Sequence, residues 1–202
     1  MIVKEIFGPT IQGEGSFAGS PVSFLRLSGC NRWSGLEKDR AKSFCNFCDT
    51  DFRGGKKMSN REIFNALDLL GQRRIVISGG EPMLQLKEEH VKYLTGYMLK
   101  LHIETNGSKK MGAMLPYFEH ITCSPKQVFE ETELEFAHDL KILFPYKNCV
   151  TLDNFKDFKR NNTYLQPIMD ENYDDNLAKC IRECCLTGTK LSVQLHKILR
   201  VQ

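Results

Sequence analysis

Apolar and polar residues along this chain follow two alternating patterns, short apolar runs and longer stretches with a helical repeat. The run 22–27 places Phe24 and Arg26 on one side and leucines on the other, which is the period of a β-strand. Ser59 and Glu62 form a capping box that opens the first helical stretch. The same patterns predict further strands at 1–7, 74–78, 101–105, 121–124, 139–144, 163–168 and 191–196, and helices from 59 to Gly71 and at 86–100, 110–118, 153–160 and 170–186, the last stopping at Gly188.

Strands that alternate with helices predict a parallel sheet with right-handed crossovers. At 202 residues the chain falls short of the roughly 250 residues of an eight-unit barrel. We therefore expect an α/β fold, a partial, open (β/α)6 barrel. Because no linker or repeat divides the sequence, we expect a single domain over residues 1–202, with an insertion at about 31–44.

Composition excludes few functions but sets the cellular context. Hydrophobic residues make up 41% and charged residues 26% of the chain, and the net charge is +3. That charge is too small to predict nucleic-acid binding, which normally needs a clustered basic face. There is no apolar run of membrane length and no secretion signal, so we expect no membrane partner and a cytoplasmic location. Eight cysteines in such a chain favour reduced thiols and metal ligands over disulfides.

Three of these cysteines, Cys30, Cys45 and Cys48, stand at a C-x14-C-x2-C spacing. Thiolates are the ligands that zinc and iron-sulfur centres favour. A structural zinc site needs four ligands, and the nearest histidine in sequence is His90. Three thiolates suit a four-iron cluster whose last iron stays open to a small molecule, while a zinc site or three core cysteines remain alternatives. Looping out 31–44 costs only about 1.4 kcal/mol more than a three-residue gap.

The other cysteines predict no second metal site. Cys180, Cys184 and Cys185 share one predicted helix, but no histidine or aspartate completes a ligand set there. We expect them to be ordinary helix residues, and Cys123 and Cys149 to be buried residues in or beside strands.

Polar residues gather where the predicted strands end. In a parallel α/β sheet the carboxyl ends of the strands form one edge, and ligands bind there. Six separate segments therefore predict one active-site mouth. These segments are Cys30, 78–80, 104–106, 124–126, 166–167 and 196–197.

The segment Cys45-Asn46-Phe47-Cys48 resembles the C-x-aromatic-C end of the radical S-adenosylmethionine signature, although most of that superfamily has three residues between the first two cysteines. Further motifs are similar to those of the 7-carboxy-7-deazaguanine synthase family, and they extend from Thr10 to His196. They are Gln-Gly-Glu-Gly at 12–15, Phe-Cys-Asp-Thr at 47–50, Ser-Gly-Gly-Glu-Pro at 78–82, Glu-Thr-Asn-Gly at 104–107, Ser-Pro-Lys at 124–126 and His-Lys at 196–197.

The resemblance implies a lyase of the deazapurine (queuosine-type) pathway that contracts the ring of 6-carboxy-5,6,7,8-tetrahydropterin to 7-carboxy-7-deazaguanine with loss of ammonia. It implies a 4Fe-4S cluster on Cys30, Cys45 and Cys48, S-adenosylmethionine at the open iron, and Mg²⁺ at Thr50. The cluster and S-adenosylmethionine would generate a 5′-deoxyadenosyl radical, so the cofactors carry the difficult chemistry. A reducing partner such as flavodoxin or ferredoxin and a homodimer are also implied.

Site residues follow from the same resemblance. From the residues alone, Arg26 could clamp a carboxylate or form a surface ion pair, and the loop at 11–14 could be a solvated turn. By resemblance, the cofactor contacts are Phe47, which packs beside the adenine, Asp49, Gly80, Ser124, Pro125, Lys126 and Gln166. The substrate contacts are Ile11, Gln12, Gly13, Glu14, Arg26, Ser78, His196 and the terminal carboxylate of Gln202.

Two other functions stay open on the sequence. A glycyl-radical activating enzyme would also be small and open-sided, but such enzymes carry the narrow C-x3-C-x2-C spacing that this chain lacks. A non-catalytic zinc-binding module would use the same cysteines without iron or sulfide.

Overall fold

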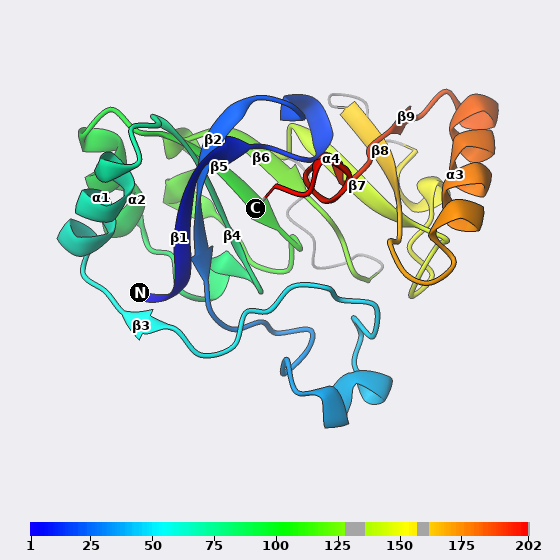
Figure 1. Cartoon of the computed structure of the whole chain (residues 1–202), viewed down its shortest axis with the longest axis horizontal. Coiled ribbons are helices and arrows are strands. Elements are labelled where there is room, and N and C mark those ends of the chain that lie inside the picture. The colour runs from blue at the N-terminus through cyan, green and yellow to red at the C-terminus, as the bar shows by residue number, and fades with distance from the viewer. Residues whose placement is uncertain (128–135, 157–161, 202) are drawn as a thin grey trace.

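A single nine-stranded sheet forms the centre of the protein (Figure 1). The computed structural model describes residues 1–127, 136–156 and 162–201. In these residues the strand order is β3-β1-β2-β4-β5-β6-β7-β8-β9. The strands are β1 (Ile2–Ile11), β2 (Pro21–Leu27), β3 (Lys56–Lys57), β4 (Arg74–Gly79), β5 (Lys100–Thr105), β6 (Phe118–Cys123), β7 (Asp139–Phe144), β8 (Asn162–Pro167) and β9 (Lys190–Leu191).

The sheet confirms the predicted open barrel. From β2 through β9 each neighbouring pair is parallel, while β1 pairs antiparallel with both β2 and β3. Six of the parallel strands are full-length and β9 has only two residues. Short 3-10 turns serve as several of the connections. The helices are α1 (Asn60–Leu69), α2 (Glu88–Gly96), α3 (Tyr173–Thr187) and α4 (Leu195–Leu199).

Local sequence signals explain where the helices start and stop. Ser59 caps α1 by accepting from the Glu62 amide, and the Glu62 carboxylate accepts from the Ser59 amide at 2.8 Å, which confirms the capping box. Gly71 follows α1 with φ 73° and Gly188 caps α3 with φ 71°. Glycine adopts this left-handed conformation without steric cost, so both stops agree with the sequence.

Side chains of the strands alternate between two environments. Leu101 and Ile103 of β5 are fully buried in the core cluster beneath α1 and α2, whereas Glu104 faces the opposite side. Leu140 and Ile142 of β7 are likewise fully buried in a second cluster with residues of α3. In Figure 1, α1 and α2 cover one end of the sheet and α3 covers the other. The outer face therefore carries the hydrophobic core, and the inner face is left for polar residues.

Several predicted boundaries were wrong. The helix predicted at 86–100 ends at Gly96, because Met98 turns the chain with φ 62° and Lys100 already pairs with Arg74. The helix predicted at 110–118 is a 3-10 turn, Gly112–Tyr117, with Pro116 inside it. The helix predicted at 153–160 is described only as the 3-10 turn Leu152–Phe155, since 157–161 lie outside the described residues.

The last predicted strand, 191–196, was also wrong. Only Lys190–Leu191 pairs with the sheet, and His196 and Lys197 lie in α4 instead of at the end of a strand. The Leu195 amide donates to the Gly13 carbonyl at 2.9 Å, so the chain leaves the sheet and crosses toward the loop that follows β1. Among the described residues, no helix is long and apolar enough to cross a membrane.

Candidate active site

The carboxyl ends of the parallel strands surround a cavity of about 300 Å³. Enzyme pockets start at roughly this volume. Its wall includes predicted site residues from seven separate segments. Of the predicted residues that the structure describes, Gly13 and Pro125 do not line it, and Gln202 lies outside the described residues. The predicted residues that line the cavity are Ile11, Gln12, Glu14, Arg26, Cys30, Cys45, Phe47, Cys48, Asp49, Thr50, Ser78, Gly80, Ser124, Lys126, Gln166 and His196.

The three cysteines share one apolar pocket at the side of this cavity. Cys45 packs in a small cluster with Trp33 and Phe52, and Cys30 and Cys48 lie against the same cluster. The Cys48 amide donates to the Cys45 carbonyl at 3.1 Å, which makes the turn between the two thiols. The sequence between the first two cysteines thus folds back as expected and brings Cys30 beside the C-x2-C turn.

Arg40 from the predicted insertion braces that turn. Its Nη1 donates to the carbonyls of Asn46 (3.0 Å) and Cys48 (2.9 Å), and its guanidinium stacks 4.2 Å from the centre of the Trp33 ring. A guanidinium offers several donors in a fixed plane, so one side chain can hold two carbonyls and an aromatic face together. The insertion therefore contributes directly to the shape of the cysteine loop.

The thiols fit a cluster in number and surroundings. Burial raises the pKa of Cys45 to about 11 and raises the pKa of Cys48, and the neighbouring thiols add to both shifts. Such thiols keep their protons until a metal centre displaces them, because metal ligation deprotonates cysteine. In the described part of the chain, no set of three or more histidine, cysteine, aspartate or glutamate side chains is arranged to hold a metal ion as it stands. A four-iron cluster is larger than one ion, and three thiols facing one cavity suit it.

Glycines bring the first cysteine against the end of β4. A Cβ at Gly80 would lie 2.1 Å from the Gly29 carbonyl oxygen and 2.7 Å from the Cβ of Cys30, so no larger residue fits. The next residue, Glu81, donates its amide to Gly29 at 2.9 Å. This close approach fixes Cys30 beside the Ser78–Gly80 segment.

The Glu81 carboxylate holds this segment in place through hydrogen bonds. It is fully buried and accepts from the Met83 amide (2.9 Å), the Thr105 hydroxyl (2.8 Å) and the Asn106 amide (2.7 Å). The Asn106 side chain in turn donates to Asn31, the residue after Cys30, at 3.0 Å. Burial raises the pKa of Glu81, while these donors act in the opposite direction.

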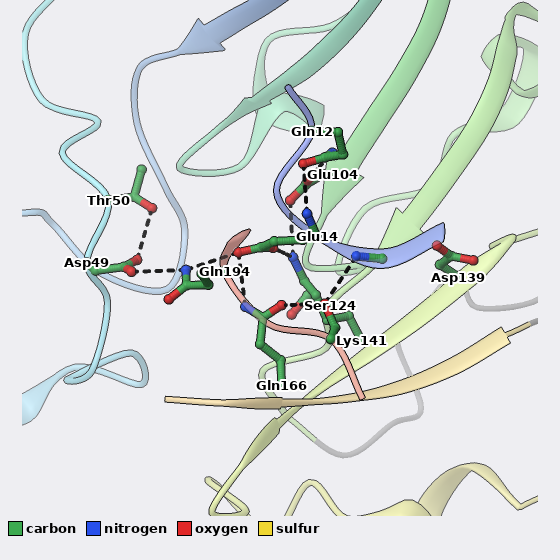
Figure 2. A network of polar contacts seen from close by, with 12 residues as sticks. Gln12, Glu14, Asp49, Thr50, Glu104, Ser124, Asp139, Lys141, Gln166 and Gln194 are labelled. Atoms are coloured by element: carbon green, nitrogen blue, oxygen red, sulfur yellow. Dashed lines mark hydrogen bonds and ion pairs between the residues drawn. The ribbon is translucent and has the colours of Figure 1, made fainter. Parts of the chain in front are cut away.

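A second group of side chains that line the cavity forms a polar wall (Figure 2). Lys141 of β7 contacts the carboxylates of both Glu14 and Glu104, the latter at 3.2 Å. Gln12 donates to Glu104 at 2.9 Å. Gln166 donates to Glu14 at 3.1 Å and accepts from Ser192 at 3.0 Å. This wall is therefore a connected polar network.

The α4 segment completes the network. Gln194 donates to Glu14 at 3.0 Å and to Asp49 at 3.4 Å, and Lys197 forms an ion pair with Asp49. Figure 2 shows Gln194 between Glu14 and Asp49. Asp49 follows Cys48, so Gln194 and α4 connect the cysteine loop to the loop that carries Glu14. Burial lowers the pKa of His196 in the same segment.

Of the two roles that the sequence left open for Arg26, the structure shows the ion pair. Arg26 forms an ion pair with Glu5 at 2.9 Å, and its guanidinium lies 5.6 Å from the centre of the Phe7 ring. Phe7 stacks on Phe24 with the ring centres 5.0 Å apart. Because Arg26 also lines the cavity, the ion pair and stacking hold the guanidinium at the cavity wall, where a carboxylate could approach it.

Lys126 lines the same cavity as the cysteines and Lys141. It donates to the Ser124 hydroxyl at 2.6 Å, and burial lowers its pKa while the cysteine thiols oppose that shift. Thr50 makes only a weak contact, with its hydroxyl 3.5 Å from Asp49. Its hydroxyl therefore keeps acceptor capacity for a ligand.

Sequence reasoning missed Lys141 and Gln194. Lys141 had a usable signal, since a lysine inside an otherwise apolar strand is rarely buried without a partner. Gln194 carried no such signal, because it falls in the part of the predicted strand 191–196 that does not pair with the sheet. Among the other cysteines, Cys180 is buried as a helix residue of α3 and Cys123 is buried in β6 as predicted, but Cys149 is exposed, with φ 60°, so its predicted burial was wrong.

Comparison with known proteins agrees with this geometry. No family model matches the chain. It is 36% identical to a 7-carboxy-7-deazaguanine synthase of Caulobacter vibrioides, covering 98% of this chain and 97% of that protein, and 36% identical to one of Burkholderia multivorans, covering 98% of both. The fold is similar to the crystal structure of QueE from Escherichia coli, with a TM-score of 0.69, 23% identity and coverage of 96% and 94%. On its similarity to these relatives over nearly its whole length, the chain belongs to the 7-carboxy-7-deazaguanine synthase family.

Proposed function

We propose that this 7-carboxy-7-deazaguanine synthase contracts the ring of 6-carboxy-5,6,7,8-tetrahydropterin inside the cavity described above. One observation carries the assignment: Cys30, Cys45 and Cys48 face the same cavity as a polar wall built on Glu14 and a guanidinium, that of Arg26. A radical enzyme needs its cluster, S-adenosylmethionine and substrate within one enclosed space, and this cavity lies between the groups suited to each.

Cys30, Cys45 and Cys48 would hold the 4Fe-4S cluster. With S-adenosylmethionine and an electron from the reducing partner, the cluster would supply the radical chemistry that removes a hydrogen atom from the substrate. The chain itself orients the groups. Phe47, Asp49, Gly80, Ser124 and Lys126 would contact the cofactor, with Pro125 fixing the backbone between the last two.

The polar wall would hold the substrate. Glu14 is an acceptor that can take two parallel hydrogen bonds from the amino and ring N–H edge of a pterin. Gln12, Gly13 and Ile11 shape its loop, and Arg26 would clamp the substrate carboxylate. Ser78, His196 and the terminal carboxylate of Gln202 complete the proposed contacts. Gln166, which we predicted as a cofactor contact, donates to Glu14, so we propose that it also supports the substrate side.

Magnesium and partners extend this proposal. Thr50 would bind Mg²⁺ together with the substrate carboxylate, since hydroxyl and carboxylate oxygens are ligands that Mg²⁺ accepts. We further propose a single domain with 31–44 as an insertion, a homodimer, and a flavodoxin or ferredoxin as electron donor. Free thiols at all eight cysteines support a reducing, cytoplasmic setting.

A product assay tests the function. The protein is reconstituted with iron and sulfide without oxygen and mixed with S-adenosylmethionine, reductant, Mg²⁺ and 6-carboxytetrahydropterin. Mass spectrometry should find 7-carboxy-7-deazaguanine and ammonia with the wild-type chain and none with Cys45→Ser. A fully loaded wild-type protein that forms no deazaguanine product would overturn the proposal.

A further inference from the structure

Lys141 is a buried lysine at the centre of the polar wall, and the proposed reaction gives it no role. It lies on the inner face of β7 with 5% of its surface exposed. Its ammonium contacts Glu14 from the loop after β1 and Glu104 from the end of β5 (Figure 2). A buried lysine is costly unless it is paired, so this position is specific.

The charges around Lys141 form an unequal set. Two carboxylates share one ammonium, which leaves one net negative charge at this wall. The other charged or titratable groups near it are Lys126 from the loop after β6 and His196 from α4, and Arg26 of β2 lines the same cavity. Gln166, on the neighbouring strand β8, is neutral.

Lys141 controls the protonation of this wall. Burial by itself would raise the pKa of Glu14, but the Lys141 ammonium, together with the Gln194 amide and His196, outweighs burial and lowers it. The converse holds for Lys141, where burial is outweighed by the carboxylates of Glu104 and Glu14 and the pKa is raised. Glu14 and Lys141 therefore stay charged across the physiological range.

We propose that Lys141 is a positioning residue that holds Glu14 ionised, so that Glu14 presents only acceptors to the N–H edge of the pterin. The proposal rests on the function proposed above, because it assumes that Glu14 meets that edge. A protonated Glu14 would point a donor at another donor, and binding would lose the hydrogen bonds that orient the ring.

Loss of the ammonium has a defined consequence. In Lys141→Met burial acts on Glu14 without the opposing ammonium, and the Glu104 carboxylate stays close by, so Glu14 takes a proton more readily as pH falls. Substrate binding should therefore be weakened at low pH and return toward normal as pH rises.

The test measures binding without turnover. Reconstituted protein with S-adenosylmethionine but no reductant is dialysed to equilibrium against 6-carboxytetrahydropterin between about pH 5.5 and about pH 8.5. The ratio of variant to wild-type Kd at each pH cancels the titration of the substrate. For Lys141→Met the ratio should exceed about tenfold at the acid end and stay within about threefold at the alkaline end. Lys141→Arg keeps the charge, so its ratio should be independent of pH.

Two further variants keep the result decisive. Lys100→Met removes an exposed lysine of β5 that pairs with Glu119, and its ratio should be one throughout. If Lys141→Met alone does not fold, the double variant Glu104→Gln, Lys141→Met removes one charge of each sign, and its ratio should also be largest at the acid end, because Glu14 still lacks the ammonium. A double variant that does not fold, or whose ratio does not change with pH, would overturn the proposal.

The outcomes separate this inference from the function itself. A Lys141→Met ratio that does not change with pH, whether near one or uniformly large, overturns the positioning role, since loss of packing alone would not titrate. Wild-type protein that fails to bind the pterin at any pH overturns the proposed function instead.

Discussion

Gly13→Ala should detach α4 from the active-site mouth. Gly13 has an ordinary backbone conformation, so an alanine there is not strained in itself. Its Cβ, however, would lie 2.0 Å from Nδ1 of His196 and 3.0 Å from the His196 backbone nitrogen, whereas ordinary contact begins at 3.4 Å. The imidazole must therefore move by about 1.4 Å or more, and the backbone contact leaves little room for a simple side-chain rotation.

The energetic cost falls on α4 and not on the sheet. The bond from the Leu195 amide to Gly13 is worth about 1 kcal/mol, and displacement of Gln194 weakens its contact with Glu14. We expect KM for the pterin to rise about tenfold, which corresponds to about 1.4 kcal/mol. The melting temperature should change little, because the core clusters are untouched.

Hydrogen exchange and steady-state kinetics check this prediction together. Amides of residues 195–199 should exchange at least about tenfold faster in Gly13→Ala. Gly96→Ala is the matched control, since a Cβ there meets nothing within 4 Å, and it should behave as wild type. Unchanged exchange in α4 together with an unchanged KM would refute the idea that α4 closes the mouth through Gly13.

Three further predictions follow from single side chains. Thr50→Ala should abolish the stimulation of turnover by Mg²⁺, and unchanged stimulation would remove Thr50 from the metal site. Glu81→Gln should lower the free energy of unfolding, measured in urea, by about 1–3 kcal/mol. The NH₂ group of the glutamine would point at one of the three hydrogen-bond donors that Glu81 accepts from, and that bond would be lost. Burial would raise the pKa of Asp139, but bonds from His120 and Ser16 lower it to about 2 from 3.8. A carboxyl group with a lowered pKa stabilises the folded protein at pH values above the pKa that it has in the unfolded chain. Asp139→Asn should therefore lower the free energy of unfolding by about 2 kcal/mol at neutral pH, and by progressively less as pH falls from about 4 toward 2. An equal loss at both ends of this pH range would contradict the prediction.

The sheet, and the edge of it that carries the candidate site, could be predicted because both depend on local patterns. The alternation that buries Leu101 and Ile103 and leaves Glu104 facing the cavity is visible in the sequence, and the parallel topology then gathers the strand ends at one edge. The capping box at Ser59 is equally local. The family motifs then predicted which residues at that edge bind the cofactor and the substrate.

The α4 segment could not be predicted, because its structure depends on distant residues. Five residues are too few for a helix that is stable by itself, and the contacts of this one are with Gly13 and Asp49. The partners of Lys141 were hidden for a similar reason. Only the tertiary arrangement brings Glu14 and Glu104, from other segments, to the same ammonium.

The most direct test of the whole account is the spectroscopy of the reconstituted cluster. The three cysteines should hold about four iron and about four sulfide ions per chain, and the electron paramagnetic resonance spectrum of the reduced protein should change when S-adenosylmethionine binds the open iron. Cys48→Ser should lose both properties. Stoichiometric zinc without sulfide, or a reduced spectrum that S-adenosylmethionine leaves unaltered, would contradict the account.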